Sequence, residues 1–342
     1  MMIPYSSPFV YFSLSLSLQS NNLNNTNRKV SFIFIFHLTT VYVMTLHATR
    51  EAAVVLVDGP ALVHRWFHRW SYATKQGSTV DSKRFVIKNA RFALARAHSF
   101  DPSHLAQNLL SPQVEYAHTP KHNKVIVCFD NGDGGRTELF PDYKKNRRQV
   151  ARDPELSVMM KVAKRVFLEE PEGTILVLPD SNPRLKMINA EADDMIATIA
   201  LRNQKYKVPT VVVSHDFDLY QLIDDNCKSY HYDIRTKYLV SEKGVIDRIG
   251  IHPKLVRDYK ALAGDASDGV PGVKGIGKVR AQSLLKKYGD LDGVLTKGIK
   301  KETGRVGEIL REGVKDAELS RKIVDFRLCP KIMPTVEQFM KK

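Results

Sequence analysis

The chain has 342 residues, of which 43% are apolar, so it is long enough to bury one large or two ordinary hydrophobic cores. Its 52 Lys and Arg outnumber its 37 Asp and Glu, and the formal charge of +15 indicates a polyanionic partner, most commonly nucleic acid. Cys128, Cys227 and Cys329 lie far apart and form no CxxC pair, which argues against a zinc cluster and a disulfide framework.

Residues 1–50 differ in composition from the rest of the chain. They contain no Asp or Glu and are rich in Ser and Asn. The apolar run at 31–43 is shorter than the ~20 residues of a membrane helix, so we expect no membrane span. We predict a disordered leader, a possible transit peptide for a mitochondrion or chloroplast. The alternative is that Met44 is the true start, which would leave the protein in the cytoplasm or nucleus.

Three segments share one pattern, a short run rich in Val and Ile that stops at Asp. They are "AAVVLVDG" (52–59), "KVIVCFDNG" (124–132) and "PTVVVSHDFD" (209–218). Such runs, separated by helical stretches, predict a parallel sheet buried on both faces, whose ligands bind beyond the carboxyl ends of the strands. We therefore expect one crevice to contain Asp58, Asp130, Asp216 and Asp218. A fourth strand at 174–181 ends at Asp180, which we assign to a loop outside the site.

The stretch "NAEADDMIATIA" (189–200) places Glu191, Asp193 and Asp194 at the start of an apolar helical pattern. One interpretation is capping, because acids in the first turn stabilise a helix. The other is a metal site, because three carboxylates this close repel one another without a cation. If this helix precedes the strand near 210, its first turn lies at the same sheet edge, and seven acids converge. Oxygen ligands without His or Cys favour Mg²⁺ or Mn²⁺.

A glycine-rich turn, "PGVKGIG", lies between two helical patterns further along the chain. Gly272, Gly275 and Gly277 lack Cβ atoms and so let backbone amides approach a phosphate closely, without reading bases. An ordinary helix–turn–helix corner is the alternative. The next helix offers further phosphate contacts from Lys278, Arg280, Lys286 and Lys287. Just before the turn, "GDASD" adds two more acids, Asp265 and Asp268.

These strings together resemble the 5′-3′ exonuclease and flap endonuclease family, which includes the 5′-nuclease domain of bacterial DNA polymerase I and stand-alone plant organellar relatives. The resemblance covers residues 52–330 and rests on five strings in order: "VDGPALVHRWFH", "FDNG…ELFPDYKKNR", "AEADDMIATIA", "SHDFDLYQLI" and "GDASDGVPGVKGIG". It implies an α/β fold with a PIN-like parallel sheet core, a helical arch and a C-terminal helix-three-turn-helix region that binds duplex DNA and K⁺. We expect a leader (1–50), a nuclease core with arch (51–240), the helix-three-turn-helix region (241–335), a tail (336–342) and no polymerase domain.

The resemblance also implies roles for individual residues. The metal-binding acids of the family fall on Asp58, Asp130, Glu191, Asp193, Asp194, Asp216, Asp218, Asp265 and Asp268. Its catalytic basic pair falls on Lys144 and Arg147, and Tyr143 is a base-stacking candidate, although "YKKNRR" alone would suit a solvated basic face. We expect residues 144–170 to form the arch that receives a single-stranded 5′ end.

The implied function is hydrolysis of DNA phosphodiester bonds by two or more Mg²⁺ or Mn²⁺ ions, in DNA replication and repair. The expected partner is DNA with 5′ ends or flaps, bound by a monomer without sequence preference and without a membrane. Two alternatives stay open: an RNA-processing PIN nuclease, and a catalytically inactive DNA-binding protein.

The chain departs from the family pattern at three places. His215 and Phe217 stand where relatives usually have Gly and Lys, and Gly269 replaces the usual Asn, which we expect to loosen the loop holding Asp268. The stretch 171–190 is longer than is typical of the family, and its role is open.

Overall fold

The structure is a computed structural model that describes residues 53–98, 123–151, 153–171 and 173–342. The predictions for the leader at 1–50 lie outside these ranges. Within them, no helix combines the length and apolar character that a membrane crossing requires.

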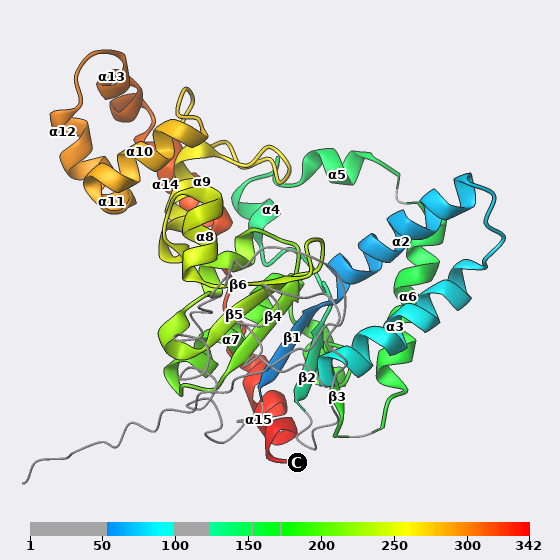
Figure 1. Cartoon of the computed structure of the whole chain (residues 1–342). Coiled ribbons are helices and arrows are strands. Elements are labelled where there is room, and N and C mark those ends of the chain that lie inside the picture. Colours follow the sequence, from blue (N-terminus) through cyan, green and yellow to red (C-terminus); the bar gives the residue numbers. More distant parts are fainter. Residues whose placement is uncertain (1–52, 99–122, 152, 172) are drawn as a thin grey trace, which may run out of the picture. The chain divides into compact units, whose positions relative to one another are not determined.

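The structure contains one six-stranded sheet, in the order β3-β2-β1-β4-β5-β6 (Figure 1). All neighbouring strands pair in parallel except β6, which runs antiparallel to β5. The predicted parallel sheet is therefore confirmed, including the fourth predicted strand, and it gains an antiparallel edge. The strands are β1 (Val54–Asp58), β2 (Lys124–Cys128), β3 (Ile175–Leu178), β4 (Thr210–Ser214), β5 (Ser229–Asp233) and β6 (Tyr238–Val240).

Helices cover both faces of this sheet, which explains why its strands read as continuous apolar runs. In β1, Val55 and Val57 pack with the helices of one face, whereas Val54 and Leu56 pack with those of the other. The first face carries α2 (Gly59–Lys75), α3 (Ser82–His98) and α6 (Pro154–Leu168), and the second carries α7 (Ala192–Lys205) and α15 (Met333–Lys341).

Helix α6 corrects the predicted arch. Met159, Ala163 and Phe167 lie one helical turn apart and are buried against the sheet face, so α6 is a core helix. Among the described residues of 144–170, only the short α5 (Lys145–Gln149), which buries no residue, and the exposed Val150, Ala151 and Asp153 after it fit the arch. The basic residues that suggested a continuous arch lie on the side of α6 that faces away from the apolar core.

The C-terminal helical region has its own apolar core. Val245, Leu262, Leu284 and Leu310 are among its buried residues, and the glycine-rich turn connects α9 with α10. The remaining helices are α4 (Arg136–Leu139), α8 (Glu242–Ile249), α9 (Val256–Ala263), α10 (Lys278–Tyr288), α11 (Leu291–Gly293), α12 (Ile299–Lys301), α13 (Gly304–Glu312) and α14 (Val314–Val324).

The predicted tail at 336–342 is wrong, because this segment belongs to α15 and packs on the sheet. Val336 is fully buried and Phe339 is 6% exposed, in the same apolar cluster as α7. Ile332, Val336 and Phe339 have helical spacing, but so short a pattern gives a weak signal at a chain end. The chain thus returns from the helical region to the sheet.

Candidate active site

Four carboxylates lie at the carboxyl edge of the sheet, three of them among the four acids that the strand pattern placed there. We call Asp58, Asp130, Asp193 and Asp216 the sheet-edge acids; they come from the ends of β1, β2 and β4 and from the first turn of α7. Hydrogen bonds tie these elements together. Ser214 Oγ donates to Asp58 Oδ2 at 2.6 Å, and the Ala192 amide donates to Asp130 Oδ1 at 2.9 Å.

Burial and the negative charges of neighbouring sheet-edge acids raise the pKa of Asp58 and of Asp193. Burial raises the pKa of Asp58 to about 7; hydrogen bonds from Ser214 and Ala61 oppose the rise, and the charges of Asp216 and Asp130 add to it. Burial, with Asp216 and Asp58 next in importance, holds the pKa of Asp193 well above its ordinary value. No Lys or Arg in the described part of the chain forms an ion pair with a sheet-edge acid. Such concentrated, uncompensated charge suits a bound cation.

A second group of acids is paired with basic side chains, beginning with Glu191. Lys144 Nζ lies 2.6 Å from Glu191 Oε1 and 3.9 Å from Asp268 Oδ2. Burial lowers the pKa of Lys144, but the charges of Glu191 and Asp268 outweigh burial and raise it. Arg147 Nη2 lies 2.5 Å from Asp268 Oδ1. The structure therefore places the predicted basic pair, Lys144 and Arg147, directly against two of the predicted metal-binding acids.

Lys260 of α9 forms ion pairs with the other two acids of this group, Asp218 and Asp265, the latter at 2.6 Å. This lysine is 6% exposed. It was not among the predicted site residues. Burial tends to raise the pKa of Asp265, but Lys260 and hydrogen bonds from Ser267 lower it to about 2. A lysine on the apolar face of a helix, five residues before an acid, was the available signal.

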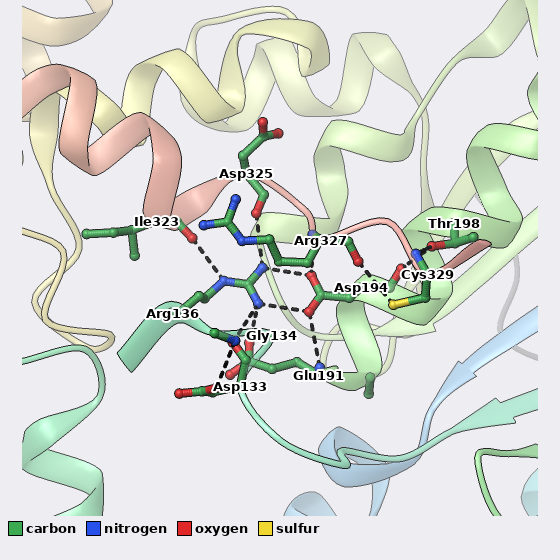
Figure 2. A network of polar contacts seen from close by, with 12 residues as sticks. Asp133, Gly134, Arg136, Glu191, Asp194, Thr198, Ile323, Asp325, Arg327 and Cys329 are labelled. Atoms are coloured by element: carbon green, nitrogen blue, oxygen red, sulfur yellow. Dashed lines mark hydrogen bonds and ion pairs between the residues drawn. The ribbon is translucent and has the colours of Figure 1, made fainter. Parts of the chain in front are cut away.

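Asp194, one of the predicted metal-binding acids, is surrounded by protein donors. It is fully buried, and both of its carboxylate oxygens accept hydrogen bonds from Arg136, at 2.7 and 2.8 Å (Figure 2). The backbone amides of Glu191 and Arg327 donate to the same two oxygens. With its oxygens taken by protein donors, Asp194 has a structural place in the site. Arg136 was not predicted either.

One pocket brings the two groups of acids together. Its lining residues include acids from α7, from the segment after β4 and from the loop before the glycine-rich turn: Glu191, Asp193, Asp218 and Asp268. Among the described residues, no three His, Cys, Asp or Glu side chains are arranged to hold one ion as they stand. Lys144, Lys260 and Arg136 form ion pairs with acids of this pocket. The acids of the pocket offer carboxylate oxygens, the ligand type that hard divalent cations prefer.

The ring of Tyr143, the predicted base-stacking residue, is buried in this structure. The residue is 4% exposed and packs in a small apolar cluster with Val270, Ile323 and Val324. Its hydroxyl lies 3.0 Å from Glu191 Oε2, to which it donates. Tyr143 therefore supports Glu191 from behind the pocket.

The three glycines of the turn differ in backbone conformation and in what surrounds them. Gly272 has a φ of +62°, a Cβ there would lie 2.2 Å from the Gly264 amide nitrogen, and its own N–H donates to Ser320 Oγ. Its amide is thus not available to a phosphate, contrary to expectation. Gly275 has a φ of +91°, and a Cβ there would lie 2.9 Å from Ile309 Cδ1. Gly277 faces open space, with nothing within 4 Å of an added Cβ.

Helix α10 presents its four predicted basic residues to the outside. Lys278, Arg280, Lys286 and Lys287 are all exposed. Arg280 Nη1 donates to the Gly275 carbonyl, and Lys287 Nζ lies 2.6 Å from Glu302 Oε1. Gly277 is the N-cap residue of α10, so the open glycine directly precedes the helix that carries these exposed bases.

The structure shows the contacts of residues at which the chain departs from the family pattern. Gly269 has a φ of +73°, and a Cβ there would lie 2.7 Å from the Asp142 carbonyl oxygen, so glycine permits a close approach that keeps the loop together. The ring of Phe217 packs against Tyr220 and Tyr259. In the stretch 171–190, Asn189 Oδ1 accepts hydrogen bonds from the amides of Asp133 and Gly134, which braces the loop after β2.

Comparisons with known proteins agree with this geometry. Residues 53–250 match the family described as 5′-3′ exonuclease, N-terminal resolvase-like domain, and residues 251–341 match 5′-3′ exonuclease, C-terminal SAM fold. The 5′-3′ exonuclease of Bacillus subtilis (strain 168) is 30% identical over 282 residues, which cover 80% of this chain and 82% of that protein. The thermostable DNA polymerase I of Thermus thermophilus is 36% identical over 201 residues, which cover 58% of this chain but only 22% of the polymerase.

Solved structures show the same fold. A structure described as T5 D15 protein co-crystallized with metal ions superposes with a TM-score of 0.59 at 18% identity, covering 80% of this chain and 89% of that one. T5 5′-exonuclease with divalent zinc ions bound gives a TM-score of 0.57 at 19% identity, with the same coverage. The sheet, the C-terminal helical region and the two matched domains lead to one conclusion: the chain belongs to the 5′-3′ exonuclease family.

Proposed function

We propose that this chain is a divalent-metal-dependent nuclease that hydrolyses DNA phosphodiester bonds at 5′ ends and 5′ flaps, in DNA replication and repair. The observation that carries the proposal is the convergence of the sheet-edge acids, whose charge has no basic partner among the described residues. The name of the B. subtilis relative and a T5 flap endonuclease complex with DNA and metal ions support the same activity.

The proposed cofactor is Mg²⁺ or Mn²⁺, as two or more ions. The sheet-edge acids would hold these ions together with the acids that now pair with Lys144, Arg147 and Lys260. Such ions activate water for attack and stabilise the negative charge of the leaving oxygen. A K⁺ ion at the glycine-rich turn stays a prediction.

The chain's own basic residues would act on the substrate. Lys144 and Arg147 border the pocket, and their fixed charges would neutralise the negative charge that develops on the scissile phosphate. Gly277 and the exposed bases of α10 would bind the phosphates of duplex DNA, a contact that is independent of base sequence. We propose that one monomer suffices, since a single chain supplies all of these groups.

The length of the product from a 5′-end-labelled flap substrate tests this proposal. With Mg²⁺, a single flap-length product indicates endonuclease action and a mononucleotide indicates exonuclease action, and both require that EDTA abolish cleavage. A labelled RNA flap of the same sequence is the matched control. Faster cleavage of the RNA, or cleavage that persists in EDTA, would contradict the proposal.

A further inference from the structure

Arg136 connects the segment after β2 to a distant part of the chain. We call residues 323–329, which run from the last two residues of α14 into the segment before the last helix, the C-terminal strap. The guanidinium uses all five of its N–H donors: two go to Asp194, one to the Asp133 carbonyl, and two to the strap carbonyls of Ile323 and Asp325, each at 3.0 Å (Figure 2). A planar fork with five donors is required here, and lysine cannot replace it.

Asp194 completes the connection from the side of α7. Its Oδ1 accepts from the Arg327 amide at 2.7 Å, and its main-chain oxygen accepts from Thr198 Oγ1. Thr198 Oγ1 in turn accepts from the Cys329 amide at 2.8 Å. The strap is thus bound to α7 directly through the amides of Arg327 and Cys329, and indirectly through Arg136 at Ile323 and Asp325 (Figure 2).

The same pair fixes the backbone that carries two of the site acids. Asp194 Oδ2 accepts from the Glu191 amide at 3.1 Å, and a capping box closes the first turn of α7. Asp193 lies in that turn between the two. The strap also begins at Ile323, which packs on Tyr143, and Tyr143 donates to Glu191. The position of Glu191 therefore depends on the pair through its backbone and through its side chain.

We propose that Arg136 and Asp194 are positioning residues, which hold the first turn of α7 and the C-terminal strap so that Glu191 and Asp193 can bind a divalent ion that Asp194 does not touch. This inference rests on the proposed function, because it takes the neighbouring acids to be metal ligands. Partners that orient metal ligands from behind typically account for roughly 10- to 100-fold in metal affinity.

Electrostatics and positioning predict opposite results for the loss of Arg136, which makes the proposal testable. Removing a positive charge beside the acids should tighten cation binding if charge alone matters. Removing a positioning residue should weaken binding, because Glu191 and Asp193 lose their arrangement. If Arg136 and Asp194 act only through each other, the double variant should lose no more metal affinity than the worse of the two single variants.

Calorimetric titration with Mn²⁺, in the absence of DNA, measures this directly. We expect Arg136→Gln, Arg136→Lys and Asp194→Asn each to weaken Mn²⁺ binding by roughly 10- to 100-fold, and Arg136→Gln/Asp194→Asn to weaken it no further. The matched control is Arg202→Gln, which removes the 3.7 Å ion pair between the other end of α7 and Glu337 of the last helix, and should leave Mn²⁺ affinity unchanged. Unchanged or tighter binding by Arg136→Gln, or additive losses in the double variant, would overturn the proposal.

Cysteine alkylation provides a second readout that needs neither metal nor DNA. Cys329 lies in the strap and is 8% exposed, whereas Cys128 is fully buried in β2. We expect Arg136→Gln to speed the alkylation of Cys329 by iodoacetamide, located by peptide mass spectrometry, while Cys128 stays protected. Equal labelling of both cysteines would mean general unfolding, and an unchanged Cys329 would mean that the pair does not hold the strap; either result rejects positioning. A wild-type protein that binds no Mn²⁺ contradicts the proposed function instead, and leaves this second test intact.

Discussion

Lys144 Nζ lies 2.6 Å from Glu191 Oε1, so the lysine expected to face the substrate neutralises one of the site's own acids. Its backbone amide also donates to the Asp268 carbonyl at 2.8 Å, which fixes the lysine at the edge of the pocket. A divalent ion that binds Glu191 would release Lys144 toward a phosphate. If Lys144 acts on the scissile phosphate as proposed, this ion pair would link metal binding to the availability of the lysine.

Replacing Lys144 by Ala should slow cleavage much more than it weakens binding. A cation aimed at charge that develops in the transition state acts on the chemical step, and the loss of one such group costs on the order of 10²–10³ in rate. Single-turnover rates and flap affinities, measured side by side, test this. Lys145→Ala is the control, because its Nζ forms an exposed pair with Asp142 at 2.8 Å. Equal losses of rate and affinity for Lys144→Ala would make it an ordinary phosphate contact.

The raised pKa of Asp58 predicts a pH-dependent stability of the metal-free protein. Its ordinary value is 3.8, and burial raises it to about 7 in the folded chain, so deprotonation disfavours folding as the pH rises from about 4 to about 7. Asp58→Asn removes this penalty. Its free energy of unfolding should exceed that of the wild type by an amount that grows over this range to on the order of 2–4 kcal/mol.

Urea denaturation at pH 4.5 and 7.5, in EDTA, measures the difference for Asp58→Asn. Saturating Mg²⁺ should reverse its sign at pH 7.5, because the ion stabilises the ionised wild-type acid. A difference that is independent of pH would show that Asp58 titrates normally.

Two glycine substitutions separate DNA binding from folding. Gly277→Ala adds a Cβ in open space and at a φ of −86°, so it should lower the melting temperature little while obstructing the approach of phosphate. Gly275→Val forces a bulky residue to a φ of +91° and against Ile309, so it should destabilise the helical region itself. Melting temperatures and duplex affinities of both variants show whether the turn contacts DNA or only supports the fold. An unchanged duplex affinity for Gly277→Ala would remove this turn from the DNA contact.

Phe339→Ala should destabilise the protein although it lies near the end of the chain. The ring is 6% exposed within the cluster that joins α7 to the sheet, and truncations of this kind cost about 3–5 kcal/mol. Met187→Ala, at a residue that is 89% exposed, is a control that should have little effect. Urea midpoints of the two variants provide the comparison, and similar midpoints would mean that α15 contributes little to the core.

The strand ends could be predicted from the sequence because their signal is local. A run of Val and Ile that stops at Asp58 or Asp130 contains both the strand and the position of the acid, and the apolar period after Glu191 contains α7. Sheet topology then brings the acids together at one edge. None of these steps requires knowledge of a distant partner.

The basic partners of the acids could not be predicted in this way. Arg136 contacts Asp194, 58 residues away, and Ile323, 187 residues away, so no spacing in the sequence connects them. The burial of Tyr143, predicted as a base-stacking candidate, was missed for the same reason, since the residues that pack on it, Val270, Ile323 and Val324, lie far along the chain. Lys260 gave only the weak signal of a lysine within an apolar helix.

Cleavage of a 5′ flap by Asp193→Asn in Mg²⁺ tests the central claim most directly. Asp193 lines the pocket, its pKa is raised by burial and by Asp216 and Asp58, and Asn keeps its shape while relieving repulsion, so the variant should fold at least as well as the wild type. We predict that its single-turnover rate falls by several orders of magnitude while its affinity for the flap substrate changes little. A variant that is folded, binds the flap and cleaves it at the wild-type rate would contradict the assignment of the sheet-edge acids as the metal site of a nuclease.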